Sequence, residues 1–277
     1  MKDSECIEFL QWSLPRLGMR WPGFRKVRRQ VCRRINRRMG ELGLDGIAAY
    51  RNLLKERSGE WQELDRLCRI TISRFLRDRE VYDFLADPVF PALAAQARAR
   101  GEAALRCWSA GCCAGEEPYT LALLWQYLLA PQLAGEIRLE IVATDVDPAM
   151  LARARAGRYG RGSLRELPAE WVRGSFRREQ DDFALSEPVR SRVAFLCHDL
   201  RAEPPFAAQF QLILCRNLAF TYFDAASQLA VLARLCRCLR PGGALVIGCH
   251  ERLPDHDLPL TVWQPHAKIF RYEPSVV

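Results

Sequence analysis

The sequence predicts an α/β protein with a doubly wound, mostly parallel sheet, a small helical N-terminal domain and a small β-insertion. From residue 105 onward, short apolar runs alternate with helical stretches, which is typical of parallel strands joined by helices. The first 60 residues show helical periodicity instead. An Arg- and Gly-rich stretch then interrupts the alternation. We therefore expect a helical domain over residues 1–90 and a sheet domain over 91–277, with the insertion at about 157–190.

The composition indicates a globular protein with a large core. The chain has 277 residues, 49% of them hydrophobic, and a net charge of +8, which suits one or two domains. The sequence contains no run of about 18 uncharged apolar residues, so no membrane span is expected. The first residues lack the apolar core of a signal peptide. The 11 cysteines include no CxxC pair and lie away from the histidines. This pattern favours reduced thiols in a cytoplasmic protein over zinc ligands or a disulfide framework.

A basic amphipathic helix is predicted over residues 24–39. Its apolar positions recur every four residues, at Val27, Val31, Ile35 and Met39. Like charges this dense repel one another, so the helix is either a solvated face or a docking surface for an acidic partner. That partner could be an acidic helical protein, nucleic acid or anionic lipid. The basic residues are Arg25, Lys26, Arg28, Arg29, Arg33, Arg34, Arg37 and Arg38.

The stretch before the sheet contains a polar, cationic patch. Thr71 and Ser73 lie beside Arg74 and Arg77, just before a predicted helix at residues 80–85. Hydroxyl groups before a helix are usually caps, so this patch alone is weak evidence for a site. Two further helices are predicted, at residues 47–54 and at the Ala- and Arg-rich residues 93–104. The helix at residues 93–104 is expected to join the two domains.

Residues 105–124 predict a strand, a glycine turn and a helix. Gly111 and Gly115 interrupt the apolar run, and a helix opens at Glu116-Glu117-Pro118, where proline is tolerated in the first turn. Small residues let backbone amides approach a ligand at a helix N-terminus. The spacing is not GxGxxG, and two acids oppose a phosphate, so the turn favours a ligand with an amine or hydroxyl groups. An ordinary strand-turn-helix corner is the alternative.

Four polar or glycine positions directly follow predicted strands: Gly111, Asp145, Asp199 and Arg216. Ligands of doubly wound sheets bind outside the carboxyl ends of the strands, so we expect these residues to line one crevice. An acid in the place of Asp145 can bind ribose hydroxyls, or it can simply cap the next helix. After the first strand, the predicted strands are residues 139–143, 193–197, 211–215 and 244–248, with a final edge strand at 268–272 and a short hairpin around Phe176 and Phe183 in the insertion.

Four motifs together resemble the CheR family of chemotaxis-receptor glutamate O-methyltransferases. They are SAGCCAGEEPYT at residues 109–120, ATDVD at 143–147, CRN at 215–217 with YFD at 222–224, and PGG at 241–243 with GCHE at 248–251. Residues 71–78 match more weakly, and the resemblance spans nearly the whole chain. It implies a Rossmann-like methyltransferase sheet, S-adenosyl-L-methionine as cofactor, no metal, and glutamates of chemoreceptor proteins as methyl acceptors.

The resemblance also implies roles for individual residues. Glu117 would bind the amino end of the cofactor's methionine, and Asp145 would bind the ribose. Asp199 and Leu200 would meet the adenine. Arg77 would lie near the cofactor and the transferred methyl, so it is both a cofactor-binding and a catalytic candidate. The other candidates are Tyr222 near the methyl and, along the cofactor, Thr71, Ser73, Gly111, Cys215, Arg216 and Asn217.

The sequence departs from the family pattern at four places. Ser73 replaces a Thr, Leu76 a Phe and Asp199 an Asn, and one extra residue precedes Tyr222. The resemblance also places the basic helix, with Arg25, Arg29, Arg33 and Arg37, against an acidic helical cytoplasmic domain of a receptor. Two other functions stay open: methylation of RNA or a small metabolite, and a non-catalytic module that only senses the cofactor. The intact Glu117, Asp145 and Arg216 argue against the module.

Overall fold

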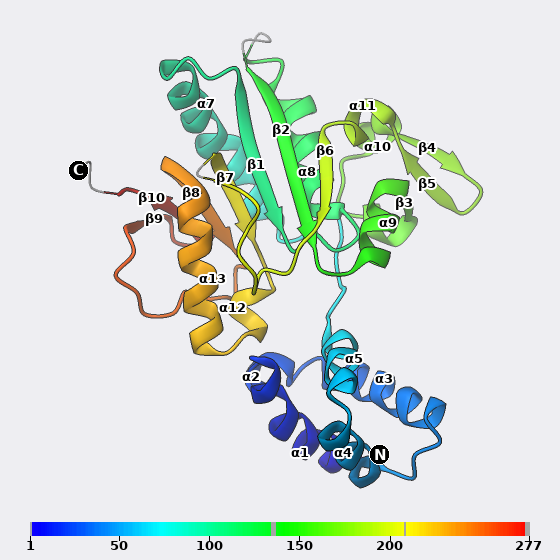
Figure 1. Cartoon of the computed structure of the whole chain (residues 1–277). Helices are drawn as coiled ribbons and strands as arrows, with labels where there is room; N and C mark the ends of the chain where they lie inside the picture. The colour runs from blue at the N-terminus through cyan, green and yellow to red at the C-terminus, as the bar shows by residue number, and fades with distance from the viewer. Residues whose placement is uncertain (1, 134–136, 208, 275–277) are drawn as a thin grey trace. The chain divides into compact units, whose positions relative to one another are not determined.

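The computed structural model describes residues 2–133, 137–207 and 209–274, which pack into two compact units (Figure 1). The first unit comprises Met1–Ile70 with Thr221–Gln228, and the second comprises Thr71–Phe220 with Leu229–Val277. The functions expected for the two parts, docking of the acceptor for residues 1–90 and cofactor binding for residues 91–277, remain predictions.

The first unit is helical. Its core contains Val31, Ile35 and Met39, three of the four positions of the predicted apolar stripe. The predicted helix over 24–39 is divided in two, because Val27 adopts ψ −1° and precedes the main helix as its N-cap. The helices are α1 (Asp3–Ser13), η1 (Leu14–Leu17), α2 (Trp21–Phe24), α3 (Arg28–Glu41), α4 (Ile47–Glu56) and α5 (Ser58–Cys68).

Two cysteines of the first unit depart from the expectation of reduced thiols throughout. Cys6 of α1 and Cys32 of α3 form a disulfide, with Cα atoms 6.1 Å apart. The nine remaining cysteines, all among the described residues, are free thiols. The pair is 26 residues apart in the sequence and meets only because α1 packs on α3, so spacing alone could not reveal it.

The second unit is built on a large sheet, which confirms the predicted fold class. Within the described ranges it has seven strands in the order β6-β2-β1-β7-β8-β10-β9, of which the first five are parallel and the last two antiparallel. The strands are β1 (Ala104–Ala110), β2 (Arg138–Asp145), β6 (Val193–Cys197), β7 (Phe210–Cys215), β8 (Leu239–Ile247), β9 (Leu260–Gln264) and β10 (Ile269–Tyr272).

The prediction of a final edge strand at residues 268–272 is wrong in one respect. β10 lies between β8 and β9, so β9 forms the edge. Every residue of β9 is at least partly exposed, and Val262 is 61% exposed. Because neither a buried run nor a regular alternation marks this strand, the sequence pattern did not reveal it.

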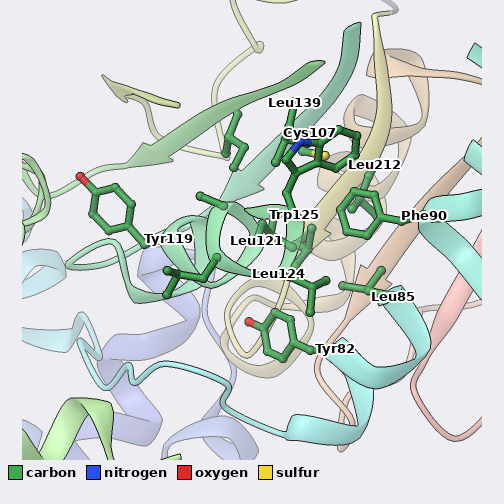
Figure 2. Close-up of a cluster of buried hydrophobic side chains, with 14 of the residues drawn as sticks. Tyr82, Leu85, Phe90, Cys107, Tyr119, Leu121, Leu124, Trp125, Leu139 and Leu212 are labelled. Carbon is green, nitrogen blue, oxygen red and sulfur yellow. The ribbon is translucent and has the colours of Figure 1, made fainter. Parts of the chain in front are cut away.

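Helices cover both faces of the sheet. On one face, Cys107 of β1 and Leu212 of β7 pack against Leu121 and Trp125, in the cluster that Figure 2 shows. On the other face, Trp108 lines a small cavity together with residues of α13. The helices of this unit outside the insertion are α6 (Arg79–Phe84), η2 (Leu85–Val89), α7 (Phe90–Ala99), α8 (Glu116–Leu124), η3 (Trp125–Leu129) and α9 (Pro148–Ala156), with α12 (Ala219–Tyr222) and α13 (Ala225–Cys238) at its boundary with the first unit.

The helix expected to join the two domains belongs to the core of the second unit. In α7, Phe90, Leu93, Ala94 and Ala97 are at most 1% exposed, and the helix packs on β1 and β8. Their spacing of three and four residues is that of a helix with one buried face, which explains the packing.

The predicted β-insertion is present. A separate antiparallel sheet in the order β3-β5-β4 contains the expected hairpin, with Phe176 opening β4 and Phe183 in β5. The elements are β3 (Arg158–Gly160), η4 (Arg161–Leu164), α10 (Ala169–Ser175), β4 (Phe176–Glu179), β5 (Asp182–Leu185) and α11 (Glu187–Arg190). In the parts of the chain described here, every helix is too short or too polar to span a lipid bilayer.

Candidate functional site

The strand order reverses beside β1, which defines a topological switch point. β1 pairs with β2 on one side and with β7 on the other, all in parallel. In open sheets of this kind, ligands bind beyond the carboxyl ends of the strands at the switch point. Gly111 follows β1, Asp145 ends β2, Asp199 follows β6 and Arg216 follows β7. The four predicted positions therefore occupy the same edge of the sheet.

The glycine turn after β1 holds the Asp145 carboxylate. The amide of Cys113 donates to Oδ2 of Asp145 at 2.8 Å, and the amide of Asp147 donates to Oδ1 at 2.9 Å. Gly111 has φ +89°, and a Cβ there would lie 2.2 Å from Cδ2 of Leu218, so the turn requires glycine. These two hydrogen bonds fix the Asp145 carboxylate at the carboxyl end of β2.

A second carboxylate, Glu117, is fixed in the first turn of α8. Ser109 Oγ donates to its Oε1 at 2.8 Å, and Nη1 of Arg216 donates to its Oε2 at 3.2 Å. The side chain of Glu117 is 14% exposed, whereas that of Arg216 is only 2% exposed. The structure thus brings together two predicted cofactor-binding residues, one from the helix after β1 and one from the end of β7.

Arg216 also contacts the segment that carries the catalytic candidate Arg77. Its Nη2 donates to the backbone oxygen of Arg77 and to Oδ2 of Asp78, both at 2.9 Å. Its Nη1 donates to Oη of the buried Tyr82 at 3.0 Å. Asp78 and Tyr82 were not among the predicted site residues. The only sequence signal for them is their closeness to Arg77, since their partner Arg216 is more than 130 residues away.

The predicted residues Thr71 and Ser73 are half-buried at the start of the same segment. Ser73 forms a hydrogen bond with Glu116, whose Oε1 also accepts one from Ser163 Oγ at 3.3 Å. Burial raises the pKa of the Glu116 carboxyl, and its Oε2 has no hydrogen-bond partner in the described part of the chain. Glu116 was missed as a site residue, although it stands directly before Glu117 in the sequence.

Two further candidates are already engaged within the protein. The Asp199 carboxylate forms an ion pair with Arg201, at 2.7 Å between Oδ2 and Nη2, and the backbone amide of Arg201 donates to its Oδ1 at 2.9 Å. Leu200 is 6% exposed and largely buried. Where the family has an amide, this chain therefore has a carboxylate that a guanidinium two residues away neutralises.

Cys215 and Asn217 flank Arg216 in different environments. The Cys215 side chain is fully buried, and this burial raises the pKa of its thiol, so only its main chain faces the turn after β7. Asn217 adopts φ +56°, and its backbone N–H donates to Oε2 of Glu251 at 2.8 Å. The amide of Gly248 donates to the same oxygen at 2.7 Å. Glu251, which the GCHE motif contains, thus joins the turns after β7 and β8 and was missed as a site residue.

Tyr222 is placed in the first unit, whereas Arg77 belongs to the second. The Tyr222 ring packs against Phe24 of α2, with ring centroids 5.0 Å apart. Its backbone oxygen accepts a hydrogen bond from the amide of Arg20 at 2.8 Å. Its proposed position near the transferred methyl remains a prediction.

The eight basic residues around α3 divide into two groups, three that are half-buried and paired within the helical unit and five that are exposed. Arg28 pairs with Asp3 at 3.0 Å, Arg34 donates to the backbone oxygen of Leu67, and Arg38 pairs with Glu60 at 2.8 Å. These arginines lie on the flanks of α3 that face α1 and α5. The exposed group consists of Arg25, Lys26, Arg29, Arg33 and Arg37.

Comparison with known families identifies both units. Residues 71–268 match the model of the CheR methyltransferase SAM binding domain, and residues 26–66 match that of the CheR methyltransferase all-alpha domain. The chain belongs to the CheR methyltransferase family. Both parts of this CheR chain, the helical unit and the sheet unit, therefore have counterparts within one family.

Several curated CheR relatives cover most of this chain. A probable chemotaxis protein methyltransferase of Rhizobium etli is 33% identical over 229 residues, which is 80% of this chain and 84% of that protein. The chemotaxis protein methyltransferase of Escherichia coli is 32% identical over 232 residues, or 81% of this chain and 76% of that protein. An uncharacterised 104.1 kDa protein of Rhodobacter capsulatus is 35% identical over 80% of this chain, which spans only 23% of that relative.

The donor set of the site fits S-adenosylmethionine. Two anchored carboxylates, Glu117 and Asp145, stand at the carboxyl edge of neighbouring strands. Such groups suit an ammonium group and a ribose diol and would repel a phosphate. No three His, Cys, Asp or Glu side chains among the described residues gather as metal ligands would.

Proposed function

We propose that this CheR protein transfers the methyl group of S-adenosylmethionine to glutamate side chains of chemoreceptor proteins in the cytoplasm. One observation carries the proposal. The part of the chain that matches the SAM binding domain holds Glu117, in the helix after β1, and Asp145, at the end of β2, as anchored carboxylates next to the switch point. The names of the Rhizobium etli and Escherichia coli relatives support chemotaxis proteins as the acceptor class.

In this proposal the cofactor lies along the carboxyl edge of the sheet. Glu117 binds its ammonium group, and Asp145 binds the ribose hydroxyls. Asp199 and Leu200 flank the adenine, with Asp199 presented by its ion pair with Arg201. The remaining contacts come from Gly111, Cys215, Asn217, Thr71 and Ser73, mostly through backbone or hydroxyl groups.

The chemistry requires positioning more than acid or base catalysis. When bound, the cofactor supplies an electrophilic methyl group on a sulfonium. A glutamate has an ordinary pKa of about 4.3 and is already an ionised nucleophile at neutral pH, so the protein needs no general base. Holding the two reacting groups in line can contribute about 7–11 kcal/mol.

Arg77 and Tyr222 are the proposed guides for the acceptor carboxylate. Nη1 of Arg77 donates to the backbone oxygen of Ile72 at 2.9 Å, which fixes the side chain while other guanidinium N–H groups remain to face an acceptor. We assign Tyr222 the role of an orienting hydrogen-bond donor.

The exposed basic row of α3 is the proposed docking surface for the acceptor protein. Arg29, Arg33 and Arg37 are spaced by four residues, so they lie along one side of the helix, and Arg25 precedes them. All four are exposed. A row of guanidinium groups complements an acidic helical bundle and speeds encounter with it.

The function is tested with labelled cofactor and membranes that contain chemoreceptors. We expect the protein to place label on the receptors, and mild alkali to release it, because methyl esters hydrolyse under these conditions. Receptors whose acceptor glutamates are replaced by glutamine serve as the control and should stay unlabelled. Absence of label, or label on the receptor that alkali does not release, would contradict the proposal, as would label found in RNA alone.

A further inference from the structure

All terminal N–H groups of Arg216 are used within the protein. Its Nη1 and Nη2 carry four hydrogens and have four acceptors: Tyr82 Oη, Glu117 Oε2, the backbone oxygen of Arg77 and Asp78 Oδ2, at 3.0, 3.2, 2.9 and 2.9 Å. The fifth donor, Nε, is buried and has no partner among the described residues. With 2% of the side chain exposed, Arg216 directs four of its five donors to groups within the protein.

The segment that Arg216 contacts has an unfavourable backbone conformation. Leu76 has φ +50° and Asp78 has φ +60°, in the left-handed region that residues other than glycine rarely adopt. Such a conformation persists only where surrounding contacts impose it. Upstream, the amide of Phe75 donates to the backbone oxygen of Ser163 at 3.2 Å, and the amide of Leu76 donates to Thr120 Oγ1 at 3.2 Å.

The downstream end of the segment depends on Arg216. The hydrogen bonds to the backbone oxygen of Arg77 and to the Asp78 carboxylate attach it directly to the guanidinium that also holds Glu117. Arg77 therefore lies between anchors on both sides, and its side chain is directed by a backbone that cannot relax while these contacts hold.

We propose that Arg216 is a positioning residue, which locks the Arg77–Asp78 backbone to Glu117 and thereby directs the Arg77 side chain toward the reacting groups. Its effect on turnover rests on the proposed methyl transfer. Its effect on the backbone does not, since the contacts are made between residues of the protein itself.

Asp78→Asn isolates the link between Arg216 and the segment. The change keeps the shape of the side chain but removes its charge, so the ion pair with Nη2 becomes a weaker hydrogen bond to a neutral acceptor. The bonds from Arg216 to Glu117 and Tyr82 remain. Burial and, after it, the nearby Asp78 carboxylate raise the pKa of the Cys249 thiol, so Cys249→Ser in the same background checks that this contact is not the cause.

The first experiment is a double-mutant cycle of Asp78→Asn with Arg77→Ala, with turnover measured at saturating cofactor. We expect Asp78→Asn alone to lower kcat by about tenfold, with the acceptor KM and cofactor Kd within about twofold of wild type. In the Arg77→Ala background the additional loss should vanish, because two residues that act through one another are not additive. Tyr82→Phe, which removes one acceptor of Arg216, should produce a smaller change in the same direction.

The matched control is Asp83→Asn, the same chemical change on α6. Asp83 is 68% exposed and pairs only with Arg79 at 3.9 Å in the described structure, so its kcat should equal that of the wild type. If Asp78→Asn has wild-type kcat, or loses as much activity with Arg77 absent as with Arg77 present, Arg216 does not act through Arg77 and the proposal is wrong.

The second experiment measures amide hydrogen exchange in the protein without cofactor. We expect Asp78→Asn to accelerate exchange at residues 73–78, with α8 and the parallel strands unchanged, whereas Asp83→Asn should not. Unchanged exchange at residues 73–78 would overturn the proposed lock whether or not the protein is active. If the wild type transfers no methyl group but Asp78→Asn still loosens this segment, the proposed function fails and the backbone lock stands.

Discussion

The arginines of α3 and the arginine after β7 use the same side chain in opposite ways. Arg29, Arg33 and Arg37 are exposed, and the nearest acid to Arg37 is Glu41 at 3.6 Å. Arg216 is buried and has an acceptor for each terminal N–H. Exposed charges act over a distance and are screened by salt, whereas buried hydrogen-bonded charges act at contact and are screened much less. Salt concentration should therefore separate recognition of the acceptor from the chemical step.

A second, partly buried arginine shows what a purely structural cluster looks like. Arg38 donates to both oxygens of Glu60, at 3.0 and 2.8 Å, and Tyr50 Oη donates to the same carboxylate at 3.0 Å. The direct partners of Arg38 are Glu60 on α5 and Glu41 on α3, and neither lies on a left-handed backbone segment. Arg216 instead divides its donors among two carboxylates, a tyrosine hydroxyl and a main-chain oxygen. We infer that the Arg38 cluster stabilises the helical unit, while the Arg216 cluster orders a site.

The largest effect on turnover is expected from Arg216→Lys. A lysine keeps the positive charge but has three donors on one nitrogen, so it cannot reach four acceptors arranged around a planar fork. We expect kcat at saturating cofactor to fall by about 100-fold, and the fall to be the same in low and high salt. Initial rates with a short acidic peptide acceptor at both salt concentrations provide the measurement. A defect that disappears at either concentration would mean that Arg216 acts through long-range charge.

Asp145→Ala should weaken cofactor binding without changing the fold. It removes the proposed acceptor of the ribose hydroxyls and also leaves the amides of Cys113 and Asp147 without their partner. The expected loss is about 1–3 kcal/mol of binding free energy. Titration calorimetry with S-adenosylmethionine measures the affinity, and circular dichroism checks the fold. Wild-type affinity in the variant would remove Asp145 from the cofactor site.

Glu60→Gln should have the smallest effect on catalysis and act on stability instead. We expect a loss of about 1.5–3 kcal/mol in unfolding free energy of the helical unit, since the hydrogen bonds to a charged carboxylate are lost. Chemical denaturation monitored by the tryptophans of α1 and α5 follows this unit. The turnover of the folded variant on a short peptide should match the wild type, and a lowered turnover would show that this cluster is not purely structural.

The same pair predicts a dependence of stability on pH. The hydrogen bond from Arg38 lowers the pKa of Glu60 in the folded protein. A lowered folded pKa means that the contribution is complete above the unfolded pKa of about 4.3 and is lost as pH falls through the folded value. Wild-type stability should therefore fall over this acidic range more steeply than that of Glu60→Gln. Parallel curves for the two proteins would contradict the assignment.

The sequence revealed the parallel sheet because its strands are buried on both faces. β7 is buried at every position, and β1 at all but one, so both are continuous apolar runs. The positions of Glu117, Asp145 and Arg216 then followed from their places after strands. The sequence did not predict β9, because a half-exposed edge strand has no clear period. It also did not predict that α7 packs on the sheet, because the periodicity of a helix does not reveal which element it packs against.

Contacts between distant segments were beyond the sequence pattern. Arg38 falls on the polar side of the predicted helix, and only the folded structure shows that Glu60 on α5 lies opposite it. The Arg216 cluster likewise joins three segments, around residues 78, 117 and 216. The motifs marked each segment as part of a site, but the division of donors among them depends on tertiary geometry.

The division between recognition by α3 and chemistry at the sheet edge is tested most directly by charge reversal. The variant carries Arg29→Glu, Arg33→Glu and Arg37→Glu, and the control carries glutamates at three exposed arginines of the second unit, Arg98, Arg138 and Arg237. Initial methylation rates are measured with the receptor protein and with a short acidic peptide, at low and high salt. We predict that the α3 variant loses most of its rate on the protein acceptor at low salt, and that raising salt brings wild type toward the variant. Its rate on the peptide and its cofactor affinity should be unchanged. A wild-type rate on the receptor at low salt would contradict this division and leave the basic row of α3 as a solvated surface.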